Sequence, residues 1–476
     1  MLQRMIHGVD IQPIAIEISR LRAFLSLIVD EEKESGHENL GIKALPNLEF
    51  NFISANSLIS LEHKEKEQKE LKDETMDGFI KSMRNIAEEY FNADSLDKKK
   101  KIKYKFDSLQ SRIINESDFL TSEDKKKFLS WNPFENKSTD FFDSEIQFGT
   151  KFFDIVIGNP PYGAKISAED KKYFKENYKY ANQGSLDTYK IFIEKGFNLL
   201  KKEGNLNYIV PLSAISNKSN IALHKMLLEN CEFVKVSSYS HRPAKVFTNA
   251  ELDVSIFNFI KTNTKCKQLF TTKLNRRNSI QSIGSVLNNL CFINSIDFVQ
   301  PEAFCKIGLP IEKSIMQKLY SQKQTLKDLI GGKQKLYYRT TGGRYYKIYT
   351  TYSTKSNTEN SFNVINSKLV AALMSSTLFW WFRNAYAEYR GHHIYQFERF
   401  PIPNFSKEII NKLEKLGKEY ETDIEKNHDY SNGVKTYKIR KSKHIIDKID
   451  RLICPLYGLT EEEMEFIIGY ELEFRV

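Results

Sequence analysis

Residues 154–162 have the sequence DIVIGNPPY, and this stretch decides which fold the chain is expected to adopt. Its apolar run predicts a buried parallel strand, which the Gly-Asn-Pro-Pro residues cannot continue. The chain is therefore expected to turn sharply at Asn159. In open α/β sheets, residues just past the carboxyl ends of strands are well placed for binding and catalysis. The stretch thus predicts an α/β fold with functional residues directly after this strand.

The four residues after this strand combine two hydrogen-bond acceptors with an aromatic ring. Asn159 has a side-chain carbonyl, and Pro160 precedes a second proline, so its backbone carbonyl has no competing donor beside it. Two adjacent acceptors suit a planar NH2 group, whose nitrogen can then face an electrophile without a strong base. Tyr162 offers a flat face to a ring that carries this amine. The alternative is an ordinary turn after a strand, with a packed tyrosine.

The sequence Asn-Pro-Pro-Tyr at 159–162, after such a strand, resembles the catalytic motif of AdoMet-dependent amino methyltransferases, above all the adenine-specific DNA methyltransferases. The resemblance implies a doubly wound, Rossmann-like sheet and S-adenosyl-L-methionine as the methyl donor. It also implies that Asn159 and the Pro160 carbonyl orient the amine, while Tyr162 stacks on a base flipped out of the duplex. Direct in-line transfer of this kind needs no metal.

Near the N-terminus, the sequence predicts a short strand that ends at Asp10 and a helix that begins at Pro13. An acidic residue at a strand end either caps the helix or binds ribose hydroxyls. The segment GVDIQP at 8–13 resembles the second cofactor motif of the same methyltransferases. This implies that Asp10 holds the cofactor's ribose and that Ile11 packs on its adenine. The apolar positions expected to pack the helix on a sheet are Ile14, Ile18, Leu21, Leu25 and Ile28.

A second strand is predicted over residues 48–53, and Asn56 follows it. The resemblance implies that Asn56 contacts the cofactor's adenine, and a turn-forming role is the alternative. The glycine-rich turn that holds the rest of the cofactor normally lies about 20 residues before the acid, but only nine residues precede Asp10. The sheet is therefore expected to be truncated at its N-terminal side. An N-terminal polypeptide with the glycine-rich motif and an endonuclease is a candidate partner.

The remainder of residues 1–265 is expected to complete a methyltransferase catalytic domain. Residues 62–145 are rich in lysine and acidic residues and predict a charged helical insertion. Residues 163–185 predict a mobile loop over the site, followed by a helix that Gly204 ends. The alternation of strands and helices predicts a mostly parallel sheet. Its further strands are expected at 206–210, 233–239 and, as the last one, 253–260.

Two further positions in this domain resemble those of related enzymes. Phe247 matches an aromatic residue that helps to sandwich the flipped base, although a core phenylalanine is the alternative. Asp187 matches a polar position near the start of a helix, and we expect it to cap that helix and to position the preceding loop.

Residues 266–476 are expected to form an α+β target-recognition domain with a helical tail. Residues 337–347 interleave aromatic and basic side chains around a Gly-Gly pair, which suits contacts with DNA grooves and phosphates, and an exposed hairpin is the alternative. Residues 366–404 resemble the target-recognition region of type IIG restriction-modification methylases, the Eco57I-like and TaqI-like enzymes. The candidate DNA-binding residues are Arg339, Arg344, Tyr345, Lys347 and Arg390.

Composition agrees with a nucleic-acid partner. The 476 residues have a formal net charge of +10, and 13% of them are aromatic, so the chain attracts phosphates and offers rings for stacking on bases. The five cysteines have neither CxxC pairs nor zinc spacing, which predicts reduced thiols. No stretch approaches the roughly 20 apolar residues of a membrane span, and no secretory pattern is evident. We therefore expect a soluble, cytoplasmic protein.

The sequence as a whole predicts a site-specific DNA adenine methyltransferase of a restriction-modification system, with double-stranded DNA as its partner. A non-catalytic DNA-binding fragment, or the recognition half of a split enzyme, is an alternative that the missing glycine-rich turn motivates. A protein glutamine methyltransferase is another, because an amide NH2 group fits the same two acceptors. The basic, aromatic C-terminal region argues against the last of these.

Overall fold

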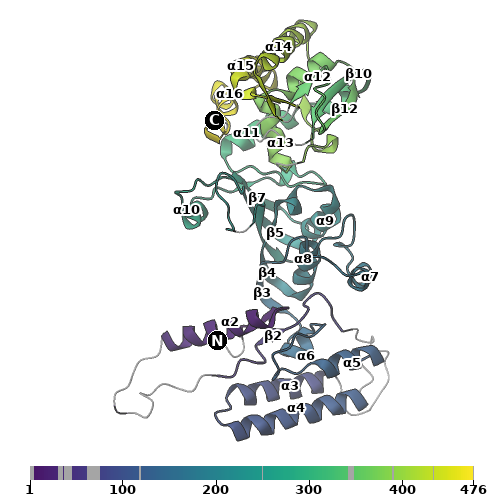
Figure 1. Cartoon of the computed structure of the whole chain (residues 1–476), viewed down its shortest axis with the longest axis vertical. Helices are drawn as coiled ribbons and strands as arrows, with labels where there is room; N and C mark the ends of the chain where they lie inside the picture. The colour runs from purple at the N-terminus through teal and green to yellow at the C-terminus, as the bar shows by residue number, and fades with distance from the viewer. Residues whose placement is uncertain are drawn as a thin grey trace. The chain divides into compact units, whose positions relative to one another are not determined.

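The computed structural model of the chain describes residues 5–29, 36, 46–61, 76–116, 120–248, 250–340, 348–388, 391–431 and 434–474. The chain divides into two compact units, residues 1–154 and 155–476 (Figure 1). The first unit contains a small sheet and several helices, and the second contains a six-stranded sheet and a mainly helical C-terminal part.

In the first unit, β1 (Gly8–Asp10) and β2 (Phe52–Ser54) pair in parallel, with Asp10 opposite Ser54. The strand β2 is shorter than predicted, because a turn closed by the Asn51 N–H and the Leu48 carbonyl (3.0 Å) precedes it. The four helices that follow are α3 (Met76–Phe91), α4 (Leu96–Glu116), α5 (Ser122–Ser130) and α6 (Ser144–Phe148). A core forms among them that includes Phe79, Phe106 and Phe128, together with Trp131 directly after α5.

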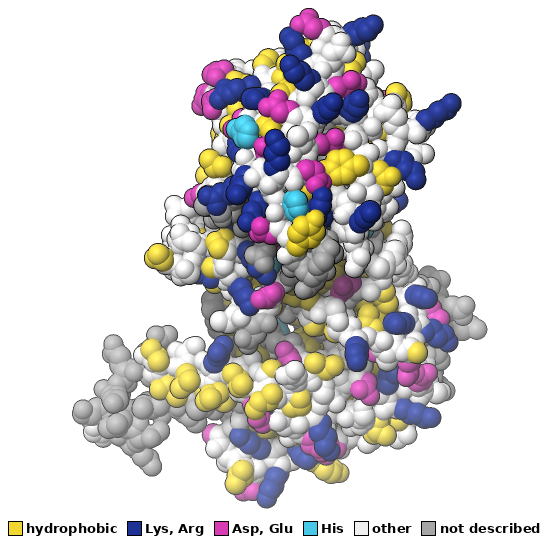
Figure 2. Space-filling view, turned by 45° about the horizontal axis from the view of Figure 1, so that its top comes forward, with side chains coloured by type: hydrophobic (Ala, Val, Ile, Leu, Met, Phe, Trp, Pro, Cys, Tyr) yellow, Lys and Arg dark blue, Asp and Glu magenta, His cyan; other side chains and the backbone are white. Residues whose placement is uncertain are grey.

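The helix α2 (Pro13–Val29) forms as predicted, but it buries a different face. Ile16 is 2% exposed and packs with Leu48 and Phe52, and Phe24 packs beside them. The apolar residues predicted to pack are 41% to 58% exposed, and hydrophobic side chains gather along this helix in Figure 2. The prediction of the packed face was wrong because a sheet of two short strands covers only a narrow stripe of the helix.

The second unit is built around a mixed sheet with the strand order β3-β4-β6-β5-β7-β8. β6 is antiparallel to both β4 and β5, whereas β5 and β7 are parallel. The α/β class is therefore confirmed, but the expectation of a mostly parallel sheet was wrong, and β6 is not its last strand. The strands are β3 (Phe153–Gly158), β4 (Leu200–Pro211), β5 (Cys231–Tyr239), β6 (Val254–Lys261), β7 (Gln268–Asn275) and β8 (Ile293–Asn294).

The strand β3 lies at one end of this sheet, with β4 as its neighbour. Val156 packs against the core of the unit, but Ile155 and Ile157 are 65% and 79% exposed. The prediction of a buried strand was therefore wrong. A terminal strand has one neighbour in the sheet, and the face that carries these two isoleucines is largely uncovered.

Two helices pack against this sheet. α8 (Thr188–Leu199) packs against β4, and α9 (Ile221–Asn230) packs against β5 (Figure 1). α8 ends earlier than predicted, because the backbone becomes extended at Leu200 and Gly204 lies within β4. The segment before α8 is not all loop either, since it contains α7 (Ala168–Asn177), whose first turn is capped by the Ser167 side chain.

The C-terminal part of the unit has a continuous apolar core in which Trp381 is 1% exposed. Its helices are α10 (Ile283–Asn288), α11 (Pro310–Tyr320), α12 (Ser367–Met374), α13 (Thr377–Tyr386), α14 (Lys407–Lys426), α15 (Lys443–Ile453) and α16 (Glu461–Ile468). Its strands are β9 (Gln324–Thr325), β10 (Ile330–Arg339), β11 (Tyr349–Thr350), β12 (Glu359–Val364), β13 (Pro401–Ile402), β14 (His428–Ser431) and β15 (Val434–Tyr437). Within the described residues, no helix combines the length and the apolar character needed to cross a bilayer.

Candidate functional site

The candidate site lies where β3 ends. Asn159 is exposed, Pro160 is buried, and Tyr162 is half-buried against the core of the unit. A side chain at Gly158 would crowd the end of the strand, because its Cβ atom would lie 3.0 Å from the ring of Tyr208. The close approach of β3 to this buried tyrosine fixes the point from which the Asn-Pro-Pro-Tyr turn departs.

The turn has two proline carbonyls, and they differ in whether a hydrogen-bond donor reaches them. The Pro161 carbonyl accepts a hydrogen bond from the Thr188 hydroxyl at 2.6 Å. No donor among the described residues reaches the Pro160 carbonyl. The Asn159 Oδ1 atom accepts a hydrogen bond from the Tyr162 hydroxyl at 2.9 Å. One backbone acceptor is therefore open, and the adjacent side-chain acceptor is occupied by the tyrosine of the same motif.

The Tyr162 hydroxyl has a second acceptor, the Ile209 carbonyl, at 3.1 Å. A hydroxyl group has one hydrogen, so it donates fully to only one of these two oxygens at a time. Burial raises the pKa of Tyr162 to about 12, which keeps the hydroxyl protonated and able to donate at neutral pH. The Asn159 acceptor can thus be released to an incoming N–H group while the tyrosine stays bonded to Ile209.

The helix α8 holds the segment that surrounds the motif. The Gly163 N–H donates to Asp187 Oδ1 at 3.3 Å, and Gly163 has a φ of +60°, which favours glycine. Asp187 precedes α8 without a capping hydrogen bond from its side chain. Of the two roles expected for Asp187, loop positioning is observed and side-chain capping of the helix is not.

Two buried charged residues on α8 extend this support. The Lys190 ammonium donates to the carbonyls of Gln183 (2.6 Å), Ser185 (3.0 Å) and Ser219 (2.7 Å), and burial lowers its pKa to about 8. The Glu194 carboxylate accepts backbone N–H bonds from Lys179 (2.8 Å), Tyr180 (3.0 Å) and Ala181 (2.6 Å). These bonds fix both ends of the turn between α7 and α8.

Sequence reasoning missed Thr188, Lys190 and Glu194. The available signal was the presence of a lysine and a glutamate at i and i+4 on a helix whose other inward positions, apart from its first residue, Thr188, are largely apolar. Charged residues on an apolar face are costly to bury unless they are paired with polar groups. Such a pair next to a candidate motif therefore indicates a segment that the helix must hold in place.

The loop 240–253 between β5 and β6 carries Phe247, which is half-buried. A cavity of about 130 Å³ lies beside this loop and has an apolar lining. Ile209 contributes to the cavity, and its carbonyl is the second acceptor of Tyr162, so the cavity adjoins the motif. Its other lining residues include Tyr239, Val246, Ile256, Ile283, Val286 and Leu287.

The candidate cofactor residues lie together in the first unit, at the carboxyl ends of β1 and β2. The Asp10 carbonyl accepts the Ala55 N–H at 3.0 Å, and Ile11 follows with 58% of its surface exposed. The Asp10 carboxylate accepts the Gln12 N–H at 2.8 Å, and Asn56 Oδ1 accepts the Leu58 N–H at 3.2 Å. Both polar side chains stabilise local turns, and each keeps acceptor capacity for a ligand.

Of the candidate DNA-binding residues, only Arg339 lies within the described part of the chain. Its guanidinium donates to the Lys435 carbonyl at 2.9 Å and lies 5.3 Å from the ring centroid of Tyr437. Burial lowers its pKa. Arg339 thus ties β10 to β15. Four of the candidates lie outside the described residues, namely Arg344, Tyr345, Lys347 and Arg390.

Comparison with known proteins places these observations in a family. A family model described as Eco57I restriction-modification methylase matches residues 4–247, which is more than half of the chain. The matched region includes Asp10, Asn56, the motif at 159–162 and Phe247.

Curated relatives and a solved structure were also found. The type II restriction enzyme and methyltransferase RM.Eco57I of Escherichia coli is 31% identical over 147 residues, which cover 29% of this chain and 13% of that protein. The type II methyltransferase M.HincII of Haemophilus influenzae is 35% identical over 113 residues, 23% of this chain and 22% of that protein. The matched region spans less than a quarter of either relative. The type IIL restriction-modification enzyme MmeI in complex with DNA is similar with a TM-score of 0.49 and 12% identity, covering 100% of this chain and 73% of that one.

Proposed function

Since the chain belongs to the Eco57I restriction-modification methylase family, we propose that it transfers a methyl group from S-adenosyl-L-methionine to the exocyclic amine of adenine in DNA. The observation that carries this proposal is the pair of acceptors at the end of β3, with Tyr162 packed beside them. The reaction would serve modification of a specific DNA site in a restriction-modification system. That role would place the protein in the cytoplasm, with the DNA.

The two acceptors determine what the motif does to an amine. Asn159 Oδ1 and the Pro160 carbonyl would each accept one amino hydrogen, which holds the NH2 group in a fixed plane. The nitrogen lone pair is then less committed to the ring and is directed at the methyl group. When bound, the cofactor supplies an electrophilic methyl on a sulfonium, which leaves as a neutral thioether. Once the new N–C bond has formed, the nitrogen carries the positive charge and releases one of its two protons to solvent water.

The residues at the ends of β1 and β2 suit the cofactor. The Asp10 carboxylate is exposed and has acceptor capacity for ribose hydroxyls, and the exposed side chain of Ile11 offers an apolar surface to a flat adenine. Asn56 offers an amide for the polar edge of that ring. These three residues would hold the nucleoside part of S-adenosyl-L-methionine.

A duplex hides the adenine amine, so the base must leave the stack at a cost of a few kcal/mol. Tyr162 and Phe247 would offset this cost by stacking on the flipped base, since stacking on an aromatic side chain contributes about 1–3 kcal/mol. Residues 266–476 would select the DNA site, with Arg339, Arg344, Tyr345, Lys347 and Arg390 as the proposed contacts.

Asn159→Ala tests the catalytic assignment. We expect methyl transfer to fall at least roughly 100-fold, because one of the two oriented acceptors is lost, while the dissociation constant for DNA changes less than about twofold. The assay uses the purified chain, labelled S-adenosyl-L-methionine and unmethylated bacterial genomic DNA, with mass spectrometry of the digested nucleosides to identify the methylated base.

Asn177→Ala is the matched control, since within the described residues its side chain donates to the Tyr173 carbonyl on α7 and to no other acceptor. Substantial methylation by Asn159→Ala would refute the catalytic role, and methylcytosine as the product would refute the choice of base. The assay is repeated with an added polypeptide that carries a glycine-rich methyltransferase motif. Transfer by the chain alone would exclude the alternative of a non-catalytic DNA-binding fragment.

A further inference from the structure

The loop 240–253 that carries Phe247 is tied at both of its ends. The His241 N–H and its Nδ1 atom both lie 2.7 Å from Asp253 Oδ1, so the first and last parts of the loop meet at one carboxylate. The ring of His241 and the Asp253 side chain are almost fully buried. Arg242 Nε donates to His241 Nε2 at 3.0 Å, so this ring nitrogen acts as the acceptor and the Nδ1–H donates to Asp253.

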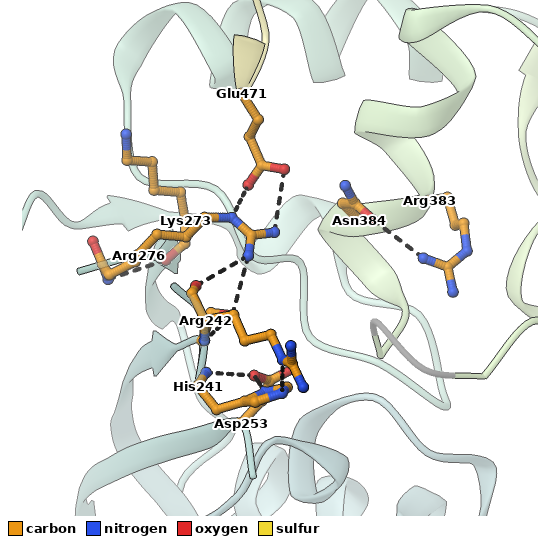
Figure 3. Close-up of polar contacts among 10 residues, drawn as sticks. His241, Arg242, Asp253, Lys273, Arg276, Arg383, Asn384 and Glu471 are labelled. Atoms are coloured by element: carbon orange, nitrogen blue, oxygen red, sulfur yellow. Dashed lines mark hydrogen bonds and ion pairs between the residues drawn. The ribbon is translucent and has the colours of Figure 1, made fainter. Parts of the chain in front are cut away.

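A second set of contacts links this loop to the C-terminal segment of the chain (Figure 3). Arg276, directly after β7, donates from Nη1 to Ser240 Oγ at 3.1 Å and to the Arg242 carbonyl at 3.4 Å. The same guanidinium forms a bidentate ion pair with Glu471, with bonds of 2.7 and 3.2 Å. Arg276 therefore bridges the start of the Phe247 loop and a residue just beyond α16.

Burial makes this bridge sensitive to the loss of one partner. The side chains of Arg276 and Glu471 are 3% and 10% exposed. Removing one partner of a buried pair leaves the other charge without compensation, which is strongly destabilising locally. Glu471 also has a φ of +52°, in the left-handed region that few non-glycine residues adopt. The backbone thus accepts a less favourable conformation where the carboxylate meets Arg276.

We propose that Arg276 and Glu471 are positioning residues that couple the C-terminal part of the chain to the loop that carries Phe247. The functional consequence of this coupling rests on the proposed function. DNA bound by the C-terminal part would position the loop so that Phe247 stacks on the flipped base. The His241–Asp253 contact closes the loop, and the Arg276–Glu471 pair anchors the closed loop to the segment that follows α16. Neither residue touches the reacting atoms.

The test compares Glu471→Gln and Arg276→Lys with Glu463→Gln in the 476-residue chain. Glutamine keeps the size of the side chain at Glu471, and lysine keeps the charge at Arg276 but not its forked hydrogen bonds. Glu463 is the matched control, because it is also a buried glutamate of the C-terminal segment and pairs with Lys318 at 2.6 Å, a residue outside the loop. Thermal melting confirms that each variant is folded.

Hydrogen exchange of peptides within 241–252 is measured first without DNA. We expect these peptides to exchange roughly 2- to 30-fold faster in the Arg276 and Glu471 variants than in the wild type. This range corresponds to the coupling energies carried by residues that lie between two sites. Glu463→Gln should leave this loop unchanged. Equal exchange in all three variants, or an unchanged loop in Glu471→Gln, would overturn the proposal.

Steady-state methylation of genomic DNA provides the second measurement. Glu471→Gln should lower kcat by a factor similar to its effect on exchange and leave the KM for DNA unchanged, because the contact acts after binding. A higher KM at unchanged kcat would overturn the positioning role. If the wild type transfers no methyl group, the proposed function fails, while the exchange comparison still decides whether the pair anchors the loop.

Discussion

Tyr162 is the residue whose observed hydrogen bonds bear most directly on the proposed chemistry. Its hydroxyl holds the Asn159 acceptor at 2.9 Å and has the Ile209 carbonyl as an alternative at 3.1 Å. An amine that enters the site must compete with this hydroxyl for the Asn159 acceptor. Under the proposed function, the tyrosine would contribute a flat ring for stacking, and its hydroxyl would occupy the proposed amine site when no substrate is bound.

Replacing Tyr162 separates these two contributions. Tyr162→Phe keeps the ring and frees the Asn159 acceptor, so we expect kcat/KM to stay within a few-fold of the wild type. Tyr162→Ala removes the stacking surface, worth about 1–3 kcal/mol, and should lower kcat/KM roughly 5- to 150-fold. Both are measured by methylation of genomic DNA. Equal losses in the two variants would show that the hydroxyl, rather than the ring, carries the role of Tyr162.

Lys306 is a fully buried cation, and it makes stability depend on pH. Its ammonium donates to the carbonyls of Ala385 (3.3 Å) and Ala387 (3.2 Å), at the end of α13. Burial lowers its pKa to about 8, against an ordinary value of 10.5, and the charges of Arg383, Glu388 and Asp253 act on it as well. Between these two pH values, the unfolded chain binds more protons than the folded one. The contribution of Lys306 to the free energy of unfolding therefore increases from pH 8 towards pH 10.5 and decreases as the pH falls.

Lys306→Met should flatten this rise. We expect the wild type to gain on the order of 1–3 kcal/mol from Lys306 between pH 8 and 10, since one unit of pKa displacement corresponds to about 1.4 kcal/mol. Urea midpoints at pH 7, 8, 9 and 10 measure the effect. Lys323→Met, at an exposed position, should keep the wild-type profile, and an unchanged profile in Lys306→Met would contradict the assignment.

At the scale of elements, β3 combines a central strand's sequence with a terminal strand's environment. Its apolar run is typical of a strand buried on both faces. In the structure, Val156 packs on the core, while Ile155 and Ile157 expose most of their surface. An exposed, apolar strand at the end of a sheet is a site for unwanted association.

Replacing the two exposed isoleucines tests this description of β3. Ile155→Ser combined with Ile157→Ser should change the free energy of unfolding by less than about 1 kcal/mol and reduce aggregation, as measured by light scattering at high protein concentration. Val156→Ser is the control on the opposite face and should lower stability by roughly 1–3 kcal/mol. A large loss of stability in the double variant would show that these side chains are covered in solution.

At the scale of the whole molecule, the distribution of charge determines how the chain would bind DNA, its proposed partner. The chain has a formal net charge of +10. Figure 2 shows that its Lys and Arg side chains are interspersed with Asp and Glu over the visible face. Binding to DNA would then depend on local sets of basic side chains that neutralise phosphates, with release of counterions.

Salt titration measures this dependence. With about five phosphate contacts, the association constant for double-stranded DNA should fall roughly 500-fold between 50 and 200 mM salt. Fluorescence anisotropy with labelled duplexes gives the slope of the logarithm of the association constant against the logarithm of the salt concentration. A slope near zero would contradict a DNA-backbone interaction and revive a protein substrate.

The sequence by itself determined the local features whose causes are local. The Asn-Pro-Pro-Tyr turn after a strand, the strand that ends at Asp10 and the helix that begins at Pro13 all follow from apolar runs, proline geometry and glycine positions. The predicted α/β class is confirmed by the strands and helices of the structure. The predicted resemblance to the methylase family is confirmed by the family model that matches residues 4–247. The assignments of Asn159, Tyr162, Phe247 and Asp10 remain predictions for experiment.

Only the tertiary structure decided which faces are covered and which groups meet across the chain. The helical period of α2 could not show that a two-stranded sheet buries Ile16 instead of the wider apolar stripe. No pattern could show that Tyr162 bonds to Asn159 and Ile209, or that Arg276 meets Glu471. The contacts of Tyr162 with Ile209 and of Arg276 with Glu471 join residues far apart in the sequence, and their existence depends on how strands and helices pack rather than on local preference.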